Sequence, residues 1–232
     1  MQERAEGLIV RVRPLTETSL IVHWLTREWG RLGTVARGAR RPRSPFQGRL
    51  DLFFHEELVF YRSRRSDLHL LREVHLLASH PGLQTDPERL RLAAEAVRRI
   101  EQVTEPEAPV PGVFELLLGL VRHLNGHAAR ARLRLAFELR LLSLLGWDPV
   151  RPAAALSEPA RALVERLRTE DWAALEVLDP AGPVTREVTR FVERVWRDHV
   201  GVTVTERTCG PDRGGGAAQR GGGPCTPREG RV

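Results

Sequence analysis

The chain of 232 residues is long enough for one large domain or two small ones, and with 41% hydrophobic residues it can build a packed core. All 36 basic residues are arginine, and the formal net charge is +6. This composition excludes a wholly disordered chain and favours an anionic partner. The N-terminus MQERAEGLIVRVRP has no long apolar segment and no run is long enough to cross a bilayer, so we expect a cytoplasmic protein.

The positive charge is unevenly placed along the chain. Residues 1–80 contain 14 arginines and nine acidic residues, whereas residues 81–205 contain 17 arginines and 18 acidic residues. The excess charge therefore belongs to the first third of the chain. This asymmetry predicts a basic, nucleic-acid-binding module at residues 1–80, attached to a nearly neutral body.

Residues 7–75 show the period of two that is typical of β-strands. The predicted strands are separated by polar turns, and the turn at residues 27–30 offers Gly30 for a positive φ. Five short strands with one apolar side predict a small barrel, compatible with an OB-fold, whose sheet face and loops bind oligonucleotides. The predicted strands are residues 8–13, 20–25, 32–36, 57–61 and 68–74.

Residues 37–51, here called the basic loop, concentrate positive charge between two predicted strands. Residues 30–50 contain no Asp or Glu. Unpaired positive charges repel one another unless an anion lies nearby, so the loop predicts contact with the phosphates of a nucleic acid. The alternative is ordinary solvated surface. The predicted DNA-binding side chains of the loop are Arg37, Arg40, Arg41, Arg43 and Arg49.

Four more side chains are candidates for the same interface. Arg11 and Arg13 lie on the first predicted strand, where they either share a face with the basic loop or belong to the surface of the strand end. Trp29 in a turn and Phe46 in the basic loop are candidates to stack on bases, the alternative for Phe46 being that its ring packs under its own loop. Trp24 lies mid-strand between apolar neighbours and is expected in the core.

From residue 81 onward the apolar period becomes helical. Asp86 can cap a helix with Pro87 at its first position, and residues 113–124 are apolar almost all round, which predicts a central helix. We therefore predict an all-α domain at residues 81–205. Residues 206–232 are Gly-rich and have almost nothing apolar to bury, so we expect a disordered tail. The predicted helices are residues 86–100, 113–124, 128–145, 157–167 and 183–199.

Several arginines of the helical part are candidates to bind the acidic tail of a protein partner beside exposed leucines. The alternative is pairing within a helix, such as Arg134 with Glu138, which stabilises a helix only slightly. The candidates are Arg122, Arg130, Arg132, Arg134 and Arg140.

The sequence contains no set of residues that predicts catalysis. His123 and His127 have a spacing usable for a metal, but Asn125-Gly126 between them breaks the helix and no third ligand is evident, so we expect both to face solvent. GxSxG, GxxxxGK[ST] and HExxH motifs are absent from the sequence. We therefore do not expect an enzyme.

Four segments, in this order, carry a resemblance to a known family: EGLIVRVRPLTETSLIVHWLTREWGRLGTVARGARRPRS, FQGRLDLFFHEELVFYRS, SDLHLLREVHLL and FELRLLSLLGWDP. Together they resemble the RecO family of bacterial DNA repair and recombination mediators. The resemblance implies an α+β architecture, with an N-terminal five-stranded OB-fold barrel and a C-terminal helical domain, and it implies no catalysis.

The resemblance also implies partners. RecO-like proteins bind single- and double-stranded DNA, anneal complementary strands coated by the single-stranded-DNA-binding protein, and help to load RecA together with RecR. They bind the tail of the single-stranded-DNA-binding protein through the helical domain. For this chain the resemblance therefore implies DNA, RecR and that tail as partners.

One departure from the family concerns zinc. RecO-like proteins commonly carry a four-cysteine zinc module after the FELRLLSLLG-like helix, but residues 147–156 of this chain contain no cysteine. Cys209 and Cys225 are too few for an all-cysteine site, and completing them with His199 is the less favoured alternative because a Gly-rich segment gives no rigid support. We therefore predict no structural zinc and no other cofactor.

Two other functions fit the same residues. In one, the barrel binds another protein as an interaction scaffold and its arginines are only surface. In the other, the OB-fold binds RNA, which shares the electrostatics and differs in the nucleic acid bound.

Overall fold

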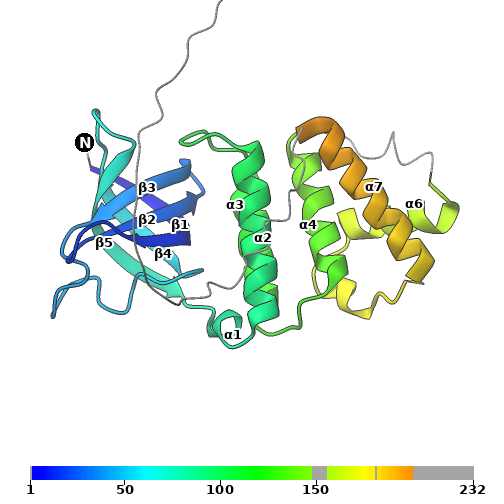
Figure 1. Cartoon of the computed structure of the whole chain (residues 1–232), viewed down its shortest axis with the longest axis horizontal. Coiled ribbons are helices and arrows are strands. Elements are labelled where there is room, and N and C mark those ends of the chain that lie inside the picture. Colours follow the sequence, from blue (N-terminus) through cyan, green and yellow to red (C-terminus); the bar gives the residue numbers. More distant parts are fainter. Residues whose placement is uncertain (1, 148–155, 181, 201–232) are drawn as a thin grey trace, which may run out of the picture. The chain divides into compact units, whose positions relative to one another are not determined.

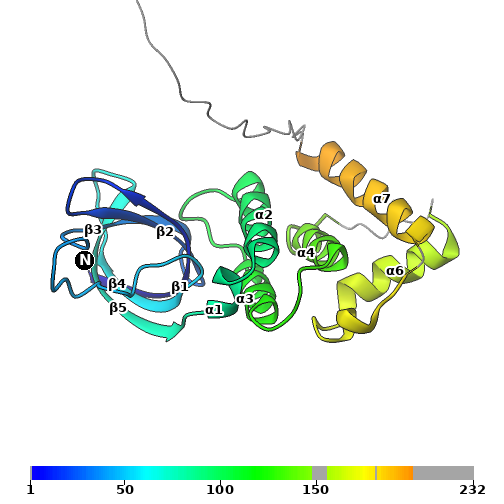
Figure 2. The same ribbon diagram turned by 60° about the horizontal axis from the view of Figure 1, so that its bottom comes forward.

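The computed structural model describes residues 2–147, 156–180 and 182–200. Its first part is a closed barrel of five strands in the order β1-β2-β3-β5-β4, seen as a ring in Figure 2. The pair β3–β5 is parallel, and the other pairs are antiparallel, with β1 against β4 closing the ring. This confirms the predicted five-stranded, OB-like barrel. The strands are β1 Gln2–Pro14, β2 Leu20–Thr26, β3 Gly30–Ala36, β4 His55–Tyr61 and β5 Leu68–Ala78.

The inside of the barrel is filled by the apolar residues that alternate along the strands. Ile9, Trp24, Leu58 and Phe60 are fully buried there. The indole Nε1 of Trp24 donates a hydrogen bond to Thr34 Oγ1 at 2.8 Å, which satisfies the one polar atom of this side chain. The prediction of Trp24 as a core residue is therefore confirmed.

The second part of the chain is helical, as predicted (Figure 1). The Asp86 side chain accepts hydrogen bonds from the backbone N–H groups of Glu88 and Arg89, so it caps α2. The helix after the Asn-Gly break starts at Ala131 rather than near residue 128. The reason is that Gly126 and His127 still donate backbone hydrogen bonds to His123 O, which prolongs the end of the preceding helix. The helices are α1 Pro81–Gln84, α2 Pro87–Val103, α3 Val113–Leu124, α4 Ala131–Leu144, α6 Glu158–Thr169, the 3₁₀ turn η1 Ala174–Val177 and α7 Gly182–Val200.

Barrel and helices share one hydrophobic cluster. Leu8, Leu25 and Phe53 of the barrel part are buried in the same cluster as the apolar residues of α2, α3 and α4. This hydrophobic contact between barrel and helices is here called the apolar joint. At its edge Arg27 forms ion pairs with Glu6 of β1 and Glu115 of α3. The division into domains at residues 80 and 205 stays a prediction. The predicted tail, residues 206–232, lies outside the described residues.

Within the described part of the chain, no helix is both long and apolar enough to cross a membrane.

Candidate nucleic-acid interface

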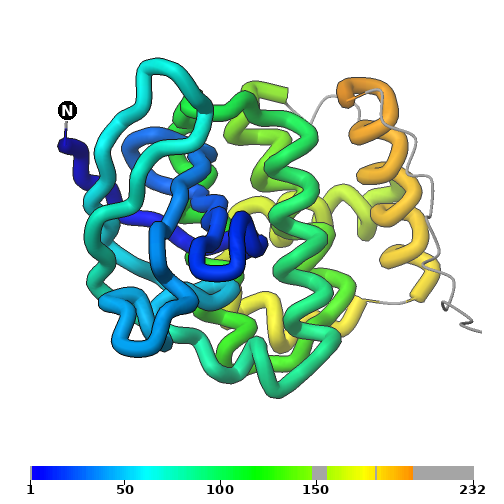
Figure 3. The backbone as a smooth tube through the Cα atoms, turned by 60° about the vertical axis from the view of Figure 1, so that its left-hand side comes forward, coloured from blue at the N-terminus to red at the C-terminus, as the bar shows by residue number. Residues whose placement is uncertain are grey.

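A hollow of about 860 Å³, here called the groove, opens on the barrel between three connections. One wall is the β1–β2 turn at residues 15–19, a second is the start of the basic loop at residues 37–41, and a third is the β4–β5 turn at residues 62–66. In OB-folds the β1–β2 and β4–β5 loops frame the ligand site. Figure 3 traces the backbone of the barrel and of these loops.

The groove combines an apolar floor with a basic rim. Val35 and Leu70 are partners across the parallel β3–β5 pair and form part of the floor. Arg37, Arg41 and Arg62 contribute three guanidinium groups to the lining. An apolar floor suits unpaired bases and a rim of guanidinium groups suits phosphates, because the fork of an arginine matches phosphate oxygens.

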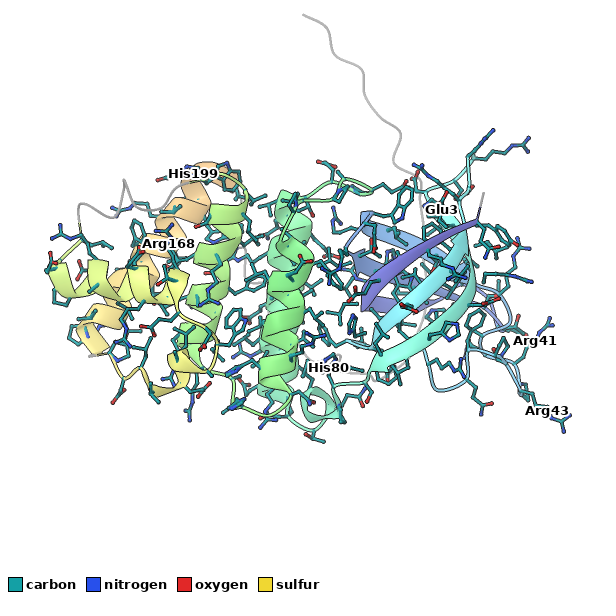
Figure 4. The ribbon with its side chains drawn as sticks, turned by 180° about the vertical axis from the view of Figure 1, so that it is seen from behind. Glu3, Arg41, Arg43, His80, Arg168 and His199 are labelled. Carbon is teal, nitrogen blue, oxygen red and sulfur yellow. The ribbon has the colours of Figure 1, made fainter. Side chains whose placement is uncertain are left out.

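Local turns hold the basic loop in place at the end of β3. Gly38 has a φ of +68°, and Arg41 N–H donates to Gly38 O at 3.0 Å. Arg40 N–H donates to Thr18 O at 3.0 Å, which ties the loop to the β1–β2 turn. Because the backbone is fixed in this way, the arginine side chains project into solvent, and Figure 4 shows Arg41 and Arg43 extending from the barrel.

The arginines of the basic loop have no carboxylate partner among the described residues. All five are exposed, and none forms an ion pair within 4.0 Å, although 12 other ion pairs of the described chain involve arginine. Their charge is therefore left for an external anion. The residues are Arg37, Arg40, Arg41, Arg43 and Arg49.

Arg49 differs from the other four because it lies over a buried acid. Its Nη1 donates to Val74 O at 3.2 Å, and its charge acts on Glu56. Glu56 is 0% exposed, and neither of its carboxylate oxygens has a hydrogen-bond partner. Burial raises the pKa of Glu56 to about 7, against the smaller lowering effect of Arg49.

Arg11 is paired within the protein, and its role in DNA binding stays a prediction. Arg11 Nη2 donates to both carboxylate oxygens of Glu101 on α2, at 2.9 and 2.8 Å. Arg13 is exposed and its Nη2 donates to His23 Nε2 at 2.9 Å. Burial and the charge of Arg13 lower the pKa of His23, so the ring stays neutral and accepts this bond. Arg13 does not line the groove, and its role in binding stays a prediction.

Both predicted stacking residues are engaged within the protein. Phe46 is 6% exposed in the barrel core, so the prediction for this ring is wrong. Trp29 is half-buried, with its ring edge-on to Phe60 at 6.1 Å and the Arg62 guanidinium over its face at 5.0 Å, so that face is occupied. The sequence pattern of a loop does not show whether its phenylalanine packs into the core or faces solvent.

Tyr61 is the aromatic residue that the sequence reasoning passed over. It is 39% exposed and lines the groove next to Arg62. It is the last residue of β4 and faces outward, opposite to the buried Phe60 beside it. The strand period places residues 57, 59 and 61 on the outer side, and this signal could have identified Tyr61.

Another face of the barrel is acidic. A hollow of about 300 Å³ over β1, β4 and β5 is lined by Glu28, Glu57 and Glu73 among others. The barrel therefore carries opposite charges on different faces. A polyanion approaching the barrel would meet positive charge at the groove and negative charge at this face.

The helical candidates are not equivalent. Arg122 and Arg130 are exposed, whereas Arg132 Nη2 donates to Glu176 O at 2.6 Å and so holds η1. Arg140 donates to Leu167 O and Glu170 O at the end of α6 and lies over the Trp172 ring. Arg132 and Arg140 thus bind neighbouring backbone, and whether they also contact a partner stays a prediction.

Arg134 and Glu138 do not form the helix pair that was the alternative. Glu138 is buried and accepts a hydrogen bond from Arg99 Nε at 2.9 Å. Arg134 is half-buried, and its charge adds to that of Arg99 in opposing the rise that burial causes in the pKa of Glu138. Whether Arg134 contacts a partner stays a prediction.

The expectation that both histidines after residue 120 face solvent is wrong for one of them. His123 is 8% exposed, and its Nε2 lies 2.9 Å from Glu176 Oε1, while His127 is exposed and stacks on the His123 ring. No group of three or more His, Cys, Asp or Glu within the described residues is arranged to hold a metal. Cys209 and Cys225 lie outside these residues, and the absence of zinc stays a prediction.

Comparison with known proteins gives the family. The model of the recombination protein O N terminal region matches residues 1–80, and that of the recombination protein O C terminal region matches residues 84–151. The DNA repair protein RecO of Roseiflexus sp. (strain RS-1) is 36% identical over 146 residues, which is 63% of this chain and 50% of the relative.

Two further relatives agree. The DNA repair protein RecO of Symbiobacterium thermophilum is 37% identical over 146 residues, 62% of this chain and 56% of the relative. That of Rhodopirellula baltica is 32% identical over 143 residues, 62% of this chain and 53% of the relative. The chain spans about half the length of each of these relatives. Because the two family models together match more than half of the sequence, the chain belongs to the RecO family of DNA repair and recombination proteins.

Proposed function

We propose that this chain binds DNA through the groove and the basic loop and acts as a recombination mediator. In this role it binds single- and double-stranded DNA, anneals complementary strands, and helps to load RecA together with RecR. The observation that carries the proposal is the set of five loop arginines without a carboxylate partner in the described chain, bordering a groove with an apolar floor. RecO proteins are non-enzymatic mediators, in keeping with a site made for binding.

The chemistry of the groove favours binding without sequence preference. Guanidinium groups on an exposed loop reach phosphate oxygens, which carry no base information. The groove adds Tyr61, Leu15 and Leu70, whose apolar surfaces accept any base. A mediator that must act at any gap needs this kind of contact.

The helical part is the proposed docking region for protein partners. Arg122 and Arg130 are the predicted tail-binding residues that remain exposed, and they are our candidates for the acidic tail of the single-stranded-DNA-binding protein. RecR is the second proposed protein partner. We propose no cofactor and a cytoplasmic, nucleoid-associated location.

A salt series tests DNA binding. For the full chain and a fluorescein-labelled oligothymidine, we expect the logarithm of the association constant to fall with the logarithm of salt concentration, and the five loop arginines alone to contribute about −3 to −4 to the slope, since each phosphate contact on a single strand adds about 0.7. Fluorescence anisotropy measures this slope. Weak binding without salt dependence would contradict the proposal and favour the protein-interaction scaffold.

Strand annealing separates a DNA mediator from an RNA-binding OB protein. We expect the chain to accelerate annealing of complementary DNA strands that are coated with the single-stranded-DNA-binding protein, because the proposed site accepts any base. Transfer between fluorophores on the two strands gives the rate. Acceleration of RNA annealing alone would support the RNA-binding alternative.

A further inference from the structure

A second hollow, of about 750 Å³, lies on the β4–β5 turn next to the groove. It shares Arg62 and Ser63 with the groove, so the two hollows are continuous along this turn. Arg64 and Arg65 also line it, together with the acidic residues Glu3 and Asp67. Both arginines are exposed and form no ion pair within the residues that the structure describes. The turn therefore carries three guanidinium groups over a short length of chain.

One carboxylate from the helical part reaches into this hollow. Glu107, in the connection between α2 and α3, accepts a hydrogen bond from Arg62 Nη2 at 2.9 Å. Its other oxygen lies 3.3 Å from Nε2 of the buried His69. Ser63 N–H donates to His69 Nδ1 at 3.3 Å, so the ring proton is on Nε2 and points to Glu107. A single anion thus bridges the turn and β5.

The backbone holds Glu107 in this position. Its φ is +54°, a left-handed conformation that is unfavourable for a residue with a side chain, and its N–H donates to Arg31 O at 2.8 Å. Pro106, beside it, forms a β-bridge with Arg31. The backbone of Glu107 is therefore fixed to the barrel independently of the pair between its carboxylate and Arg62.

From this geometry we propose that the β4–β5 turn is a second phosphodiester-binding site, in which the Glu107 carboxylate occupies the position of a phosphate. The ligand is a polynucleotide strand that leaves the groove and passes over Arg62, Arg64 and Arg65. On binding, a phosphate of the strand replaces the Glu107 carboxylate as the partner of Arg62. This inference rests on the proposed function, because it extends the path of the same strand.

The exchange is feasible because the resident pair is weak. The side chains of Arg62 and Glu107 are 47% and 26% exposed, so solvent screens their attraction. A phosphate offers the guanidinium two oxygens at once and brings further phosphates to Arg64 and Arg65. Glu107 therefore lowers the affinity of the turn for nucleic acid without abolishing it.

The test compares Glu107→Gln with Glu105→Gln in the full chain. Both variants lose one negative charge from the same connection, but Glu105 is exposed and has no ion pair within the described chain. We expect Glu107→Gln to bind oligothymidine about three- to fivefold more tightly than Glu105→Gln does, since removal of an exposed competing pair is worth at most about that factor. Equal or weaker binding by Glu107→Gln overturns the inference.

Two further variants make the result specific to the turn. In an Arg62→Ala background, Glu107→Gln and Glu105→Gln should bind oligothymidine equally well, because the guanidinium for which Glu107 and a phosphate compete is gone. A persisting difference in affinity overturns the inference. The variant Arg64→Ala/Arg65→Ala, which disturbs no ion pair of the described residues, should lower the salt slope by about 1.4, and an unchanged slope also overturns it. If the unaltered chain shows no salt-dependent binding, the proposed function fails first and this site fails with it.

Discussion

Replacing Arg37, Arg40, Arg41 and Arg43 by alanine is expected to lower affinity for single-stranded DNA about 100-fold or more at low salt, and to lower the salt slope by about 3. The physical reason is that each of these guanidinium groups is exposed and free of carboxylates in the described chain, so each can release one counterion from DNA when it binds a phosphate. The loss should be the same for all sequences, because phosphate contacts carry no base information. Anisotropy titrations over a salt series measure both quantities.

A matched control removes the same charge from the helices. The control positions are exposed or half-exposed arginines of α2 and α6 that pair with a glutamate on their own helix or, for Arg166, with Glu170 just after it. They are Arg91, Arg161, Arg166 and Arg168. Their replacement by alanine changes the net charge equally, so it should cost only the small, general part of the attraction. Equal losses for the two quadruple variants would show that net charge, rather than the basic loop, drives binding.

Replacing Glu56 by glutamine is expected to stabilise the protein at pH 8 by roughly 2–3 kcal/mol and to change stability little near pH 4.5. Glu56 is buried without a hydrogen-bond partner, and burial raises its pKa from 4.5 to about 7. The folded carboxyl is therefore protonated below pH 7, whereas the unfolded one ionises above 4.5. The energetic cost of this acid is absent below about 4.5, grows as the pH rises, and is complete above 7.

Urea unfolding at the two pH values measures the difference. Glu57→Gln is the control, because Glu57 is the next residue of β4 and is exposed. Its substitution should have a small effect that does not change with pH in this way. A Glu56→Gln variant that is less stable than the unaltered protein at both pH values would contradict the assignment of a buried, unsatisfied carboxyl.

The strands and helices were predictable because their apolar period is a local property. Residues 113–124 are almost uniformly apolar, and α3 has those bounds. The Asp86-Pro87 pair likewise marks the start of α2. Strand order was not predictable, since the parallel contact of β3 with β5 joins segments separated by the basic loop and β4.

The site was predictable in charge and only partly in geometry. The absence of acids from residues 30–50 correctly indicated arginines without local partners, but it gave no view of acids from distant elements. Glu101 on α2 neutralises Arg11, and Glu107 binds Arg62, a residue that the loop-centred reasoning did not consider. Glu138 was the alternative partner of Arg134 within its helix, yet it pairs with Arg99 of α2. Such pairings depend on tertiary packing, which a single sequence pattern does not contain.

The apolar joint of barrel and helices limits how this protein can be divided for experiments. Leu8, Leu25 and Phe53 pack with α2, α3 and α4 in one cluster, so a fragment ending at residue 80 would present these side chains to water. Such a fragment would be prone to self-association, which would interfere with any measurement of its affinity for DNA. Chimeras between relatives should for the same reason exchange both sides of the joint together.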